Sequence, residues 1–166
     1  MNAKTFHFPR NMELDGTDDQ VCQKLCQCTE PLYPGATTVL PILDLSEALQ
    51  KSLLSARRAG RLHPGMAAAA LQLASERKGL QKLQSTTGKK QAPRISRLIL
   101  LSNDGTDRFF RETEHLLEQN APRVLALRLN TDSQTLGHLL LGKNRIAKLL
   151  LIAHKDAVVK VLQALI

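Results

Sequence analysis

The densest group of side chains that could do chemistry is a set of three cysteines, Cys22, Cys26 and Cys28. Clustered thiols bind zinc, and His7 could supply a fourth ligand. A structural zinc site normally uses two separated ligand pairs, however, and the sequence has no second pair. We therefore predict no metal site, and zinc binding at these cysteines remains only an alternative. The odd number of thiols also argues against a disulfide framework and favours a reducing compartment.

A catalytic site would have to be built from scattered acids and histidines: Asp104, Asp107, His115, His138 and His154. The sequence contains no nucleophile elbow, no phosphate-binding glycine loop and no HExxH pattern. Asp104 is more simply explained as a turn residue, and Asp107 as an acid that suits the first turn of a helix. We predict a protein that is not an enzyme and that needs no cofactor and no small-molecule substrate.

Charge gives a stronger signal than any of these residues. Between residues 51 and 98 the sequence has eleven basic side chains and one acid, Glu76, whereas residues 1–50 are net acidic. A concentrated basic block attracts a polyanion, because each contact with a phosphate releases a condensed counterion. Nucleic acid is therefore the predicted partner. With 3% aromatic residues and no Trp, recognition by stacking bases on aromatic side chains is not expected.

The sequence shows neither a membrane-spanning segment nor a clear targeting signal. No apolar run approaches the roughly 18 to 20 residues that span a bilayer, so we expect no membrane contact. The first residues lack both the apolar core of a secretory signal and the arginine-rich, acid-poor composition of a transit peptide. We therefore do not expect secretion, whereas location in an organelle is not excluded by the missing transit signature.

The chain divides into two parts by pattern. Residues 1–43 are rich in proline and turn residues, which predicts an irregular N-terminal extension. From residue 44 to 166 the pattern is regular, beginning with a D-x-x-E capping box at Asp44 and Glu47. Within this domain, residues 79–96 contain Ser, Thr, Gly, Lys and Pro and no acid. We interpret this insertion as a mobile basic loop that becomes ordered on RNA.

Strands and helices alternate through the regular part. Apolar runs at residues 97–102, 124–129 and 146–153 predict strands, and a short strand is expected near residues 61–63. Helical patterns at 44–58, 65–77, 107–119, 131–141 and 156–165 lie between and after them. This alternation predicts an α/β fold, a three-layer α/β/α sandwich with a mixed sheet of about four strands.

Three stretches of this domain are similar to one family. They are LLSARRAGRLHPG at 53–65, LILLSNDGTDRF at 98–109, and TDSQTLGHLLLGKNRIAKLLLIAHKD at 131–156. The pair Leu136-Gly137, followed by Gly142-Lys143, is their most specific element. From about residue 46 to 166 the chain resembles the kink-turn-binding ribosomal proteins of the L-seven-Ae and L-thirty-e superfamily, in a bacterial-like variant.

The resemblance implies RNA binding through two regions: the start of the second helix and the loop before the last strand. Family members carry an Asn-Glu pair and then a Lys after the glycine of that helix. Here Gly65 is followed by Met66 and Ala67, and Leu71 occupies the position of the Lys. These substitutions remove hydrogen-bonding groups, so contacts to phosphates are expected in place of contacts to bases.

The predicted RNA contacts combine the basic block with the residues that the resemblance implies. They are Arg57, Arg58, Arg61, Gly65, Arg77, Lys78, Lys89, Lys90, Arg94, Arg97, Lys143, Asn144 and Arg145.

The predicted function is a structural role in a ribonucleoprotein. We expect a ribosomal large-subunit protein that binds rRNA, with the extension contacting neighbouring proteins. The added segments favour a mitochondrial ribosome over a cytoplasmic one. Two alternatives stay open: a subunit of an RNase P or box-type small particle or a bacterial-type RNA-binding accessory protein, and, in another class, a protein–protein adaptor that has lost RNA binding.

Overall fold

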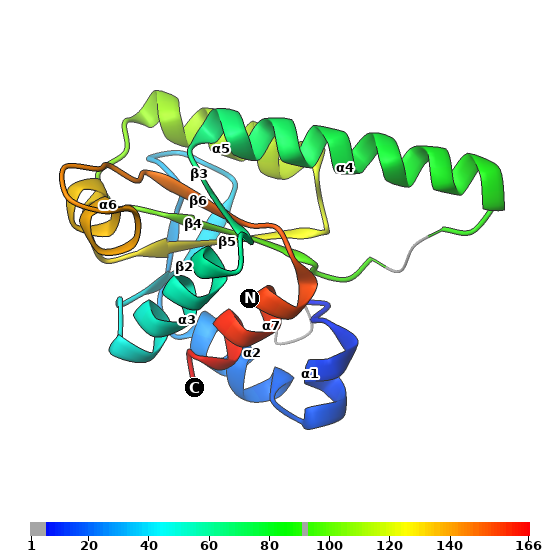
Figure 1. The fold of residues 1–166 in the computed structure, drawn as a ribbon, viewed down its shortest axis with the longest axis horizontal. Helices are drawn as coiled ribbons and strands as arrows, with labels where there is room; N and C mark the ends of the chain where they lie inside the picture. Colours follow the sequence, from blue (N-terminus) through cyan, green and yellow to red (C-terminus); the bar gives the residue numbers. More distant parts are fainter. Residues whose placement is uncertain (1–5, 91–92) are drawn as a thin grey trace.

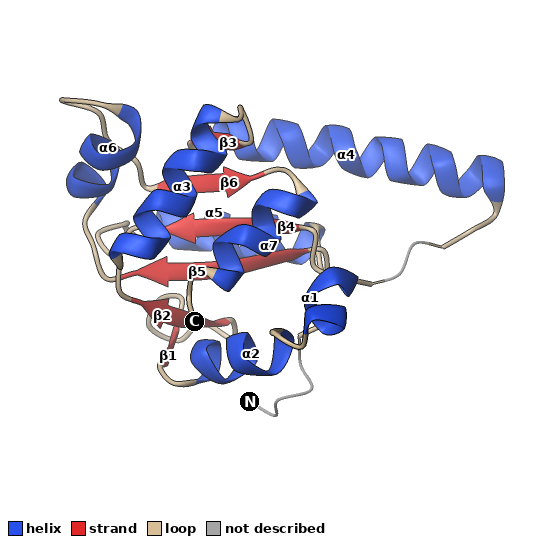
Figure 2. Cartoon of the chain, turned by 60° about the horizontal axis from the view of Figure 1, so that its bottom comes forward, coloured by secondary structure: helices blue, strands red, loops and turns tan. Residues whose placement is uncertain are grey.

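A six-stranded mixed sheet forms the centre of the molecule (Figure 2). The computed structural model describes residues 6–90 and 93–166. The strands are β1 (Thr29–Pro31), β2 (Val39–Leu43), β3 (Leu62–Pro64), β4 (Arg97–Leu101), β5 (Val124–Leu129) and β6 (Leu149–Ile152). Their order in the sheet is β1-β2-β5-β4-β6-β3. Strands β2, β5 and β4 are parallel, whereas β6 runs antiparallel to β4, β3 to β6 and β1 to β2.

Helices cover both faces of this sheet (Figures 1 and 2). They are α1 (Arg10–Asp15), α2 (Asp18–Cys26), α3 (Glu47–Arg58), α4 (Met66–Thr87), α5 (Asp107–Gln119), α6 (Ser133–Leu141) and α7 (Lys155–Gln163). Helices α4 and α5 lie on one face, and α3 and α7 lie on the other with α1 and α2. The predicted α/β class with a mixed sheet is confirmed. Within the described ranges, no helix is long and apolar enough to cross a membrane.

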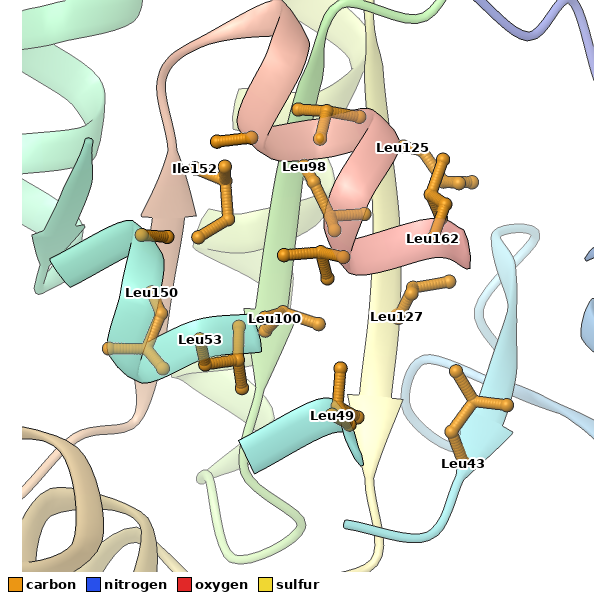
Figure 3. Close-up of a cluster of buried hydrophobic side chains, with 14 of the residues drawn as sticks. Leu43, Leu49, Leu53, Leu98, Leu100, Leu125, Leu127, Leu150, Ile152 and Leu162 are labelled. Atoms are coloured by element: carbon orange, nitrogen blue, oxygen red, sulfur yellow. The ribbon is translucent and has the colours of Figure 1, made fainter. Parts of the chain in front are cut away.

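The alternation of side chains along the strands produces two apolar cores. On β4, Leu98 and Leu100 point to the core under α3 and α7, whereas Ile99 and Leu101 point to the core under α4 and α5. Figure 3 shows the first core, where Leu49 and other leucines of the helices pack on the strands. Strands buried on both faces explain why their sequences are continuous apolar runs.

The prediction of about four strands is wrong, because β1 and β2 come from the extension that was expected to be irregular. Pro41 lies inside β2, and a proline argues against a central strand because it cannot donate to the ladder. The first half of β2 pairs with β1 and the second half pairs with β5, so Pro41 lies where the strand changes partner. The change of partner at Pro41 explains how β2 can contain a proline, a residue that is usually excluded from inner strands.

The N-terminal extension also contributes helices and part of the core. Phe8, Met12, Val21 and Leu25 are buried in the same cluster as the central leucines. Helices α1 and α2 are only 6 and 9 residues long. Their apolar residues therefore repeat too few times to reveal a helical period. Residues 1–5 of the predicted extension lie outside the described part of the chain.

Helix α4 is longer than its sequence suggests, and its far end projects beyond the sheet (Figure 1). The helix was predicted to stop near residue 77, before a basic loop. It continues through Gly79 to Thr87 and ends at Gly88, which has a positive φ of 68°. A glycine costs only about 1 kcal/mol inside a helix, and the Leu, Gln and Lys residues that follow are good helix formers. Residues 91–92 of the predicted insertion are outside the described ranges.

Glu76 fastens α4 to the sheet. Its carboxylate accepts hydrogen bonds from Arg97 Nε at 2.9 and 3.0 Å, and from Arg123 Nη2 at 3.2 Å. All three side chains are 14–19% exposed. Arg97 begins β4 and Arg123 precedes β5, so one carboxylate holds the helix against the first residues of two neighbouring strands.

We expect the substitution Glu76→Gln to destabilise the fold by about 2–3 kcal/mol, because it leaves two partly buried guanidinium groups without a countercharge. Urea unfolding followed by circular dichroism measures this loss. The matched control is Glu47→Gln, which breaks the pair between Glu47 and Lys51, whose side chains are 79% and 74% exposed. This control should cost less than about 0.5 kcal/mol. Equal losses in the two variants would show that Glu76 does not anchor α4.

Candidate nucleic-acid interface

The loop between α6 and β6 is folded tightly back on α6. Gly137 lies inside α6, and a Cβ atom at this position would be 2.2 Å from the carbonyl oxygen of Arg145. The chain turns at Gly142, whose φ is 119°, and at Asn144, whose φ is 63°. The spacing of Leu136-Gly137 and Gly142-Lys143 thus has a physical reason. One glycine permits the close approach and the other permits the turn.

Arg57 fixes α3 to the same loop. Its guanidinium group donates hydrogen bonds to the carbonyl oxygens of Leu140 and Leu141, the latter at 3.1 Å. These are terminal carbonyls of α6, which carry the negative end of the helix dipole. Arg57 therefore has a structural role in addition to its charge, which a count of basic residues does not reveal.

The start of α6 is held by Asp104, a residue that the sequence offered as a catalytic acid. Its carboxylate accepts hydrogen bonds from Ser102 Oγ at 2.7 Å, Ser133 Oγ at 2.7 Å and Ser133 N at 3.0 Å. Burial alone raises the pKa of Asp104, but the hydrogen bonds from Ser133 and Ser102 outweigh it and lower the pKa below its ordinary value. The ionised Asp104 carboxylate therefore has a structural role, because it links Ser102, at the end of β4, to Ser133, at the start of α6.

A pocket of about 470 Å³ opens between α6 and this loop. Two of its lining residues, Asn144 and Arg145, were predicted RNA contacts. His138 and Gln134 contribute further polar groups, and Ile146 is 60% exposed at the surface. The complete lining is Gln134, Thr135, His138, Leu139, Asn144, Arg145 and Ile146. The pocket thus combines an apolar wall with cationic and amide groups.

The start of α4 lies at the same end of the sheet. Gly65, with a φ of 97°, donates a hydrogen bond from its backbone N–H to the carbonyl oxygen of Leu149 at 2.8 Å. Leu149 begins β6 directly after the α6–β6 loop. The structure therefore brings Gly65 to the end of the sheet where Lys143, Asn144 and Arg145 lie.

Arg61 is at the opposite end of the sheet. Its carbonyl oxygen accepts a hydrogen bond from Ala153 N at 2.9 Å, just after β6 ends, and its side chain lies in a small depression near Lys160. Arg57, Arg58 and Arg61 therefore do not form one cluster. Arg57 reaches α6, exposed Arg58 ends α3, and Arg61 faces α7.

Exposed lysines lie on the projecting part of α4 and just after its end. Lys78, Lys89 and Lys90 were predicted contacts, and all are exposed. Lys82 was not singled out, yet it lies one turn beyond Lys78 on the same exposed face. Helical spacing would have indicated Lys82 if the helix had been predicted to continue. Arg77, nearer the body, donates to the carbonyl oxygen of Gln119 at 3.4 Å.

Two other predicted contacts are engaged within the protein. Arg94 donates a hydrogen bond to the carbonyl oxygen of Phe8 at 2.8 Å and pairs with the carboxylate of Glu13. Hydrogen bonding from Arg94 lowers the pKa of Glu13. Arg97 is held by Glu76, as described above. Both arginines stabilise the fold, and neither presents a free guanidinium group.

The cysteines lie on and just after α2. Cys22 is buried, Cys26 is half-buried and Cys28 is exposed. Burial raises the pKa of the Cys22 thiol, and the neighbouring Cys26 adds to the effect. Across residues 6–90 and 93–166, no three His, Cys, Asp or Glu side chains are gathered so that they could hold a metal ion.

The histidines considered for catalysis are dispersed. His154 accepts a hydrogen bond from Asp156 N at 3.2 Å and thereby caps α7. His115 lies within hydrogen-bonding distance of Gln119, one turn later on α5, at 3.0 Å. His138 lines the pocket beside the α6–β6 loop. The three histidines thus lie on α5, on α6 and at the start of α7.

Comparisons with known proteins give little further information. Neither protein-family models nor curated proteins match the sequence. Among solved structures, a protein of unknown function from Bacillus halodurans is 15% identical, with a TM-score of 0.47. The similarity covers 72% of this chain and 96% of that protein. It names no activity.

We expect Gly137→Ala to destabilise the protein by about 1–3 kcal/mol, because the new methyl group must displace the backbone of Arg145. The matched control is Gly79→Ala in α4, where no atom lies within 4 Å of the added Cβ. This control should stabilise the protein by about 0.5–1 kcal/mol. Thermal unfolding measures whether each variant gains or loses stability. Stabilisation by Gly137→Ala would contradict the tight packing of the loop.

The lowered pKa of Asp104 predicts a pH dependence. The ionised carboxylate stabilises the fold at neutral pH, and this contribution is lost as the pH falls through the folded pKa. Asp104 is exposed, so solvent screens its interactions, and at about pH 7 Asp104→Asn should reduce the free energy of unfolding by less than about 1 kcal/mol; the difference should shrink toward about pH 3. Urea unfolding across this range tests the prediction. Asp107→Asn, in the first turn of α5, should cost less, because it removes none of the hydrogen bonds that Ser102 and Ser133 donate to Asp104. A difference for Asp104→Asn that stays constant with pH would refute the prediction.

Proposed function

We propose that this chain is a non-catalytic RNA-binding subunit of a ribonucleoprotein. The observation that carries the proposal is the group of exposed Lys143, Asn144 and Arg145 beside the start of α4. Within the described residues, neither Lys143 nor Arg145 has an ion-pair partner. Cations without internal countercharges are available to phosphates, and each contact adds counterion release.

The pocket beside this loop suits an unpaired nucleotide. Its volume of about 470 Å³ is lined by His138 and Arg145, which can stack on a base, and by Gln134 and Asn144, which can hydrogen-bond to base edges. An RNA with unstacked nucleotides should therefore bind more tightly than a continuous duplex. The resemblance to RNA-binding ribosomal proteins indicates the same α6–β6 loop, through the pair Gly142-Lys143.

The projecting end of α4 provides a second basic region. Helix α4 has 22 residues, so its length of about 33 Å separates Gly65 from the lysines at the far end. Contacts spread over such a distance favour a large folded RNA over a short single strand. We propose that rRNA of a ribosomal large subunit is the ligand. We favour a mitochondrial ribosome, because the added segments and the lost polar residues after Gly65 mark a divergent member of the resembled family.

Fluorescence anisotropy with a labelled RNA hairpin that contains an internal loop tests the RNA-binding face. Replacing Lys143 and Arg145 together by Ala should weaken binding and flatten the dependence of log affinity on log salt by up to about 0.9 per lost phosphate contact. The control replaces Lys24 and Lys155, both exposed on other elements, by Ala. This control should leave the slope nearly unchanged.

Three outcomes of the same measurements would change the assignment. Equal slopes for the two double variants would place the RNA elsewhere on the protein. A preference for the uninterrupted duplex would exclude a role for the pocket. Absence of any salt-dependent RNA binding would favour the protein–protein adaptor. Sedimentation of the native protein then separates a ribosomal large subunit from a smaller particle of the RNase P or box type.

A further inference from the structure

A groove of about 520 Å³ runs between α4 and α5, away from the α6–β6 loop. The two helices begin at the same end of the sheet and lie side by side (Figure 1). The groove extends along α5 from Arg108 to Gln119, a span of about 16 Å, and the hydrogen bond from Arg77 to Gln119 crosses its far end. Three turns of a helix would fit in this length.

The floor of the groove is apolar because α4 begins with alanines. Met66, Ala70 and Leu116 form it, and the small side chain of Ala70 leaves the space open. The apolar surface continues around α4 to Leu71, which is 75% exposed, and to exposed Ala67. An apolar strip of this kind on a soluble domain marks an interaction surface.

The rim of the groove is basic. Arg108 and Arg111 line it with His115, and Glu112 is the acid among the lining residues. Glu112 already pairs with Arg108 at 3.3 Å. Glu114, on the same helix, is engaged by the hydroxyl of Tyr33 and the backbone N–H of Thr38. Arg111 lies over the ring of Tyr33, 5.4 Å from its centroid, and has no carboxylate partner among the described residues. An occupant that supplies carboxylates would therefore complement this rim.

We propose that the α4–α5 groove docks an amphipathic helical segment of a partner protein, with apolar side chains on Met66, Ala70 and Leu116 and carboxylates toward Arg108 and Arg111. The mode is a helix laid in a groove between two helices. The apolar floor favours protein over RNA, because the cations lie only on the rim and Met66, Ala70 and Leu116 offer no ring on which a base could stack. The groove shares no lining residue with the pocket beside the α6–β6 loop.

Selection of random 16-residue peptides displayed on phage against the full-length chain tests the proposal. Enriched peptides should carry apolar residues at helical spacing and an excess of Asp and Glu. A synthetic peptide of the enriched sequence should bind at least about tenfold more weakly to Ala70→Trp, which fills the groove, and to Arg108→Glu, which reverses the charge of its rim. The control Ala68→Trp adds the same bulk on an exposed part of α4 that does not line the groove.

The Arg108 side chain is 89% exposed, so Arg108→Glu does not disturb packing and decides the question even if Ala70→Trp fails to fold. Enrichment of basic or non-helical peptides would overturn the proposal. So would equal weakening by Ala68→Trp, or unchanged binding to Arg108→Glu. If no peptide is enriched and Arg108→Glu weakens binding of the RNA hairpin, RNA is the occupant of the groove and the proposal is overturned.

Discussion

The position of α4 depends on a single carboxylate. Glu76 binds two arginines at the first residues of β4 and β5, at the end of the sheet away from Gly65. The helix is thus held at its start by β3 and near its middle by Glu76 and Arg77, and from residue 81 to its end it is exposed. A charged group held by two partners resists displacement, because removing it from either leaves an uncompensated charge. The groove with α5 and the projecting basic end both follow from this placement.

Internal contacts of this kind reduce the number of basic side chains in residues 51–98 that are available to a polyanion. Counted along the chain, the block has one acid and appears almost uniformly available to a polyanion. In the structure, Arg97 is neutralised by Glu76, Arg94 by Glu13, and Arg57 donates to the end of α6. The available charge is concentrated instead on the lysines of α4 and on the α6–β6 loop. Arginine suits the internal contacts because its planar donors satisfy several acceptors at once, whereas lysine remains solvated at the surface.

Much of the fold could be predicted from the sequence, and the failures have identifiable causes. The strands at 97–101 and 124–129 are apolar runs between capped helices, and local rules are sufficient to find them. Strand β2 was missed because its change of partner around Pro41 depends on β5, which is remote in the sequence. The continuation of α4 was missed because residues 79–96 have the composition of a loop, although Leu, Gln and Lys in their first half favour a helix. In the candidate site, the glycine spacing identified the α6–β6 loop. The hydrogen bonds of Arg57 and Arg94 span more than eighty residues, and no local pattern contains them.

The residues that follow Gly65 are apolar at positions where the resembled family carries polar side chains. A kink-turn-type signature at the start of α4 would place amide, carboxylate and ammonium groups where this chain has Met66, Ala67 and Leu71. Met66 instead lies in the floor of the α4–α5 groove, and Ala67 and Leu71 extend its apolar surface. Burying an unpaired polar group costs free energy, so one helix start cannot readily serve both a polar RNA contact and an apolar docking surface. Under the two proposals, the first turns of α4 would therefore serve protein contact. Phosphates would bind at the α6–β6 loop and at the lysines near the far end of the helix.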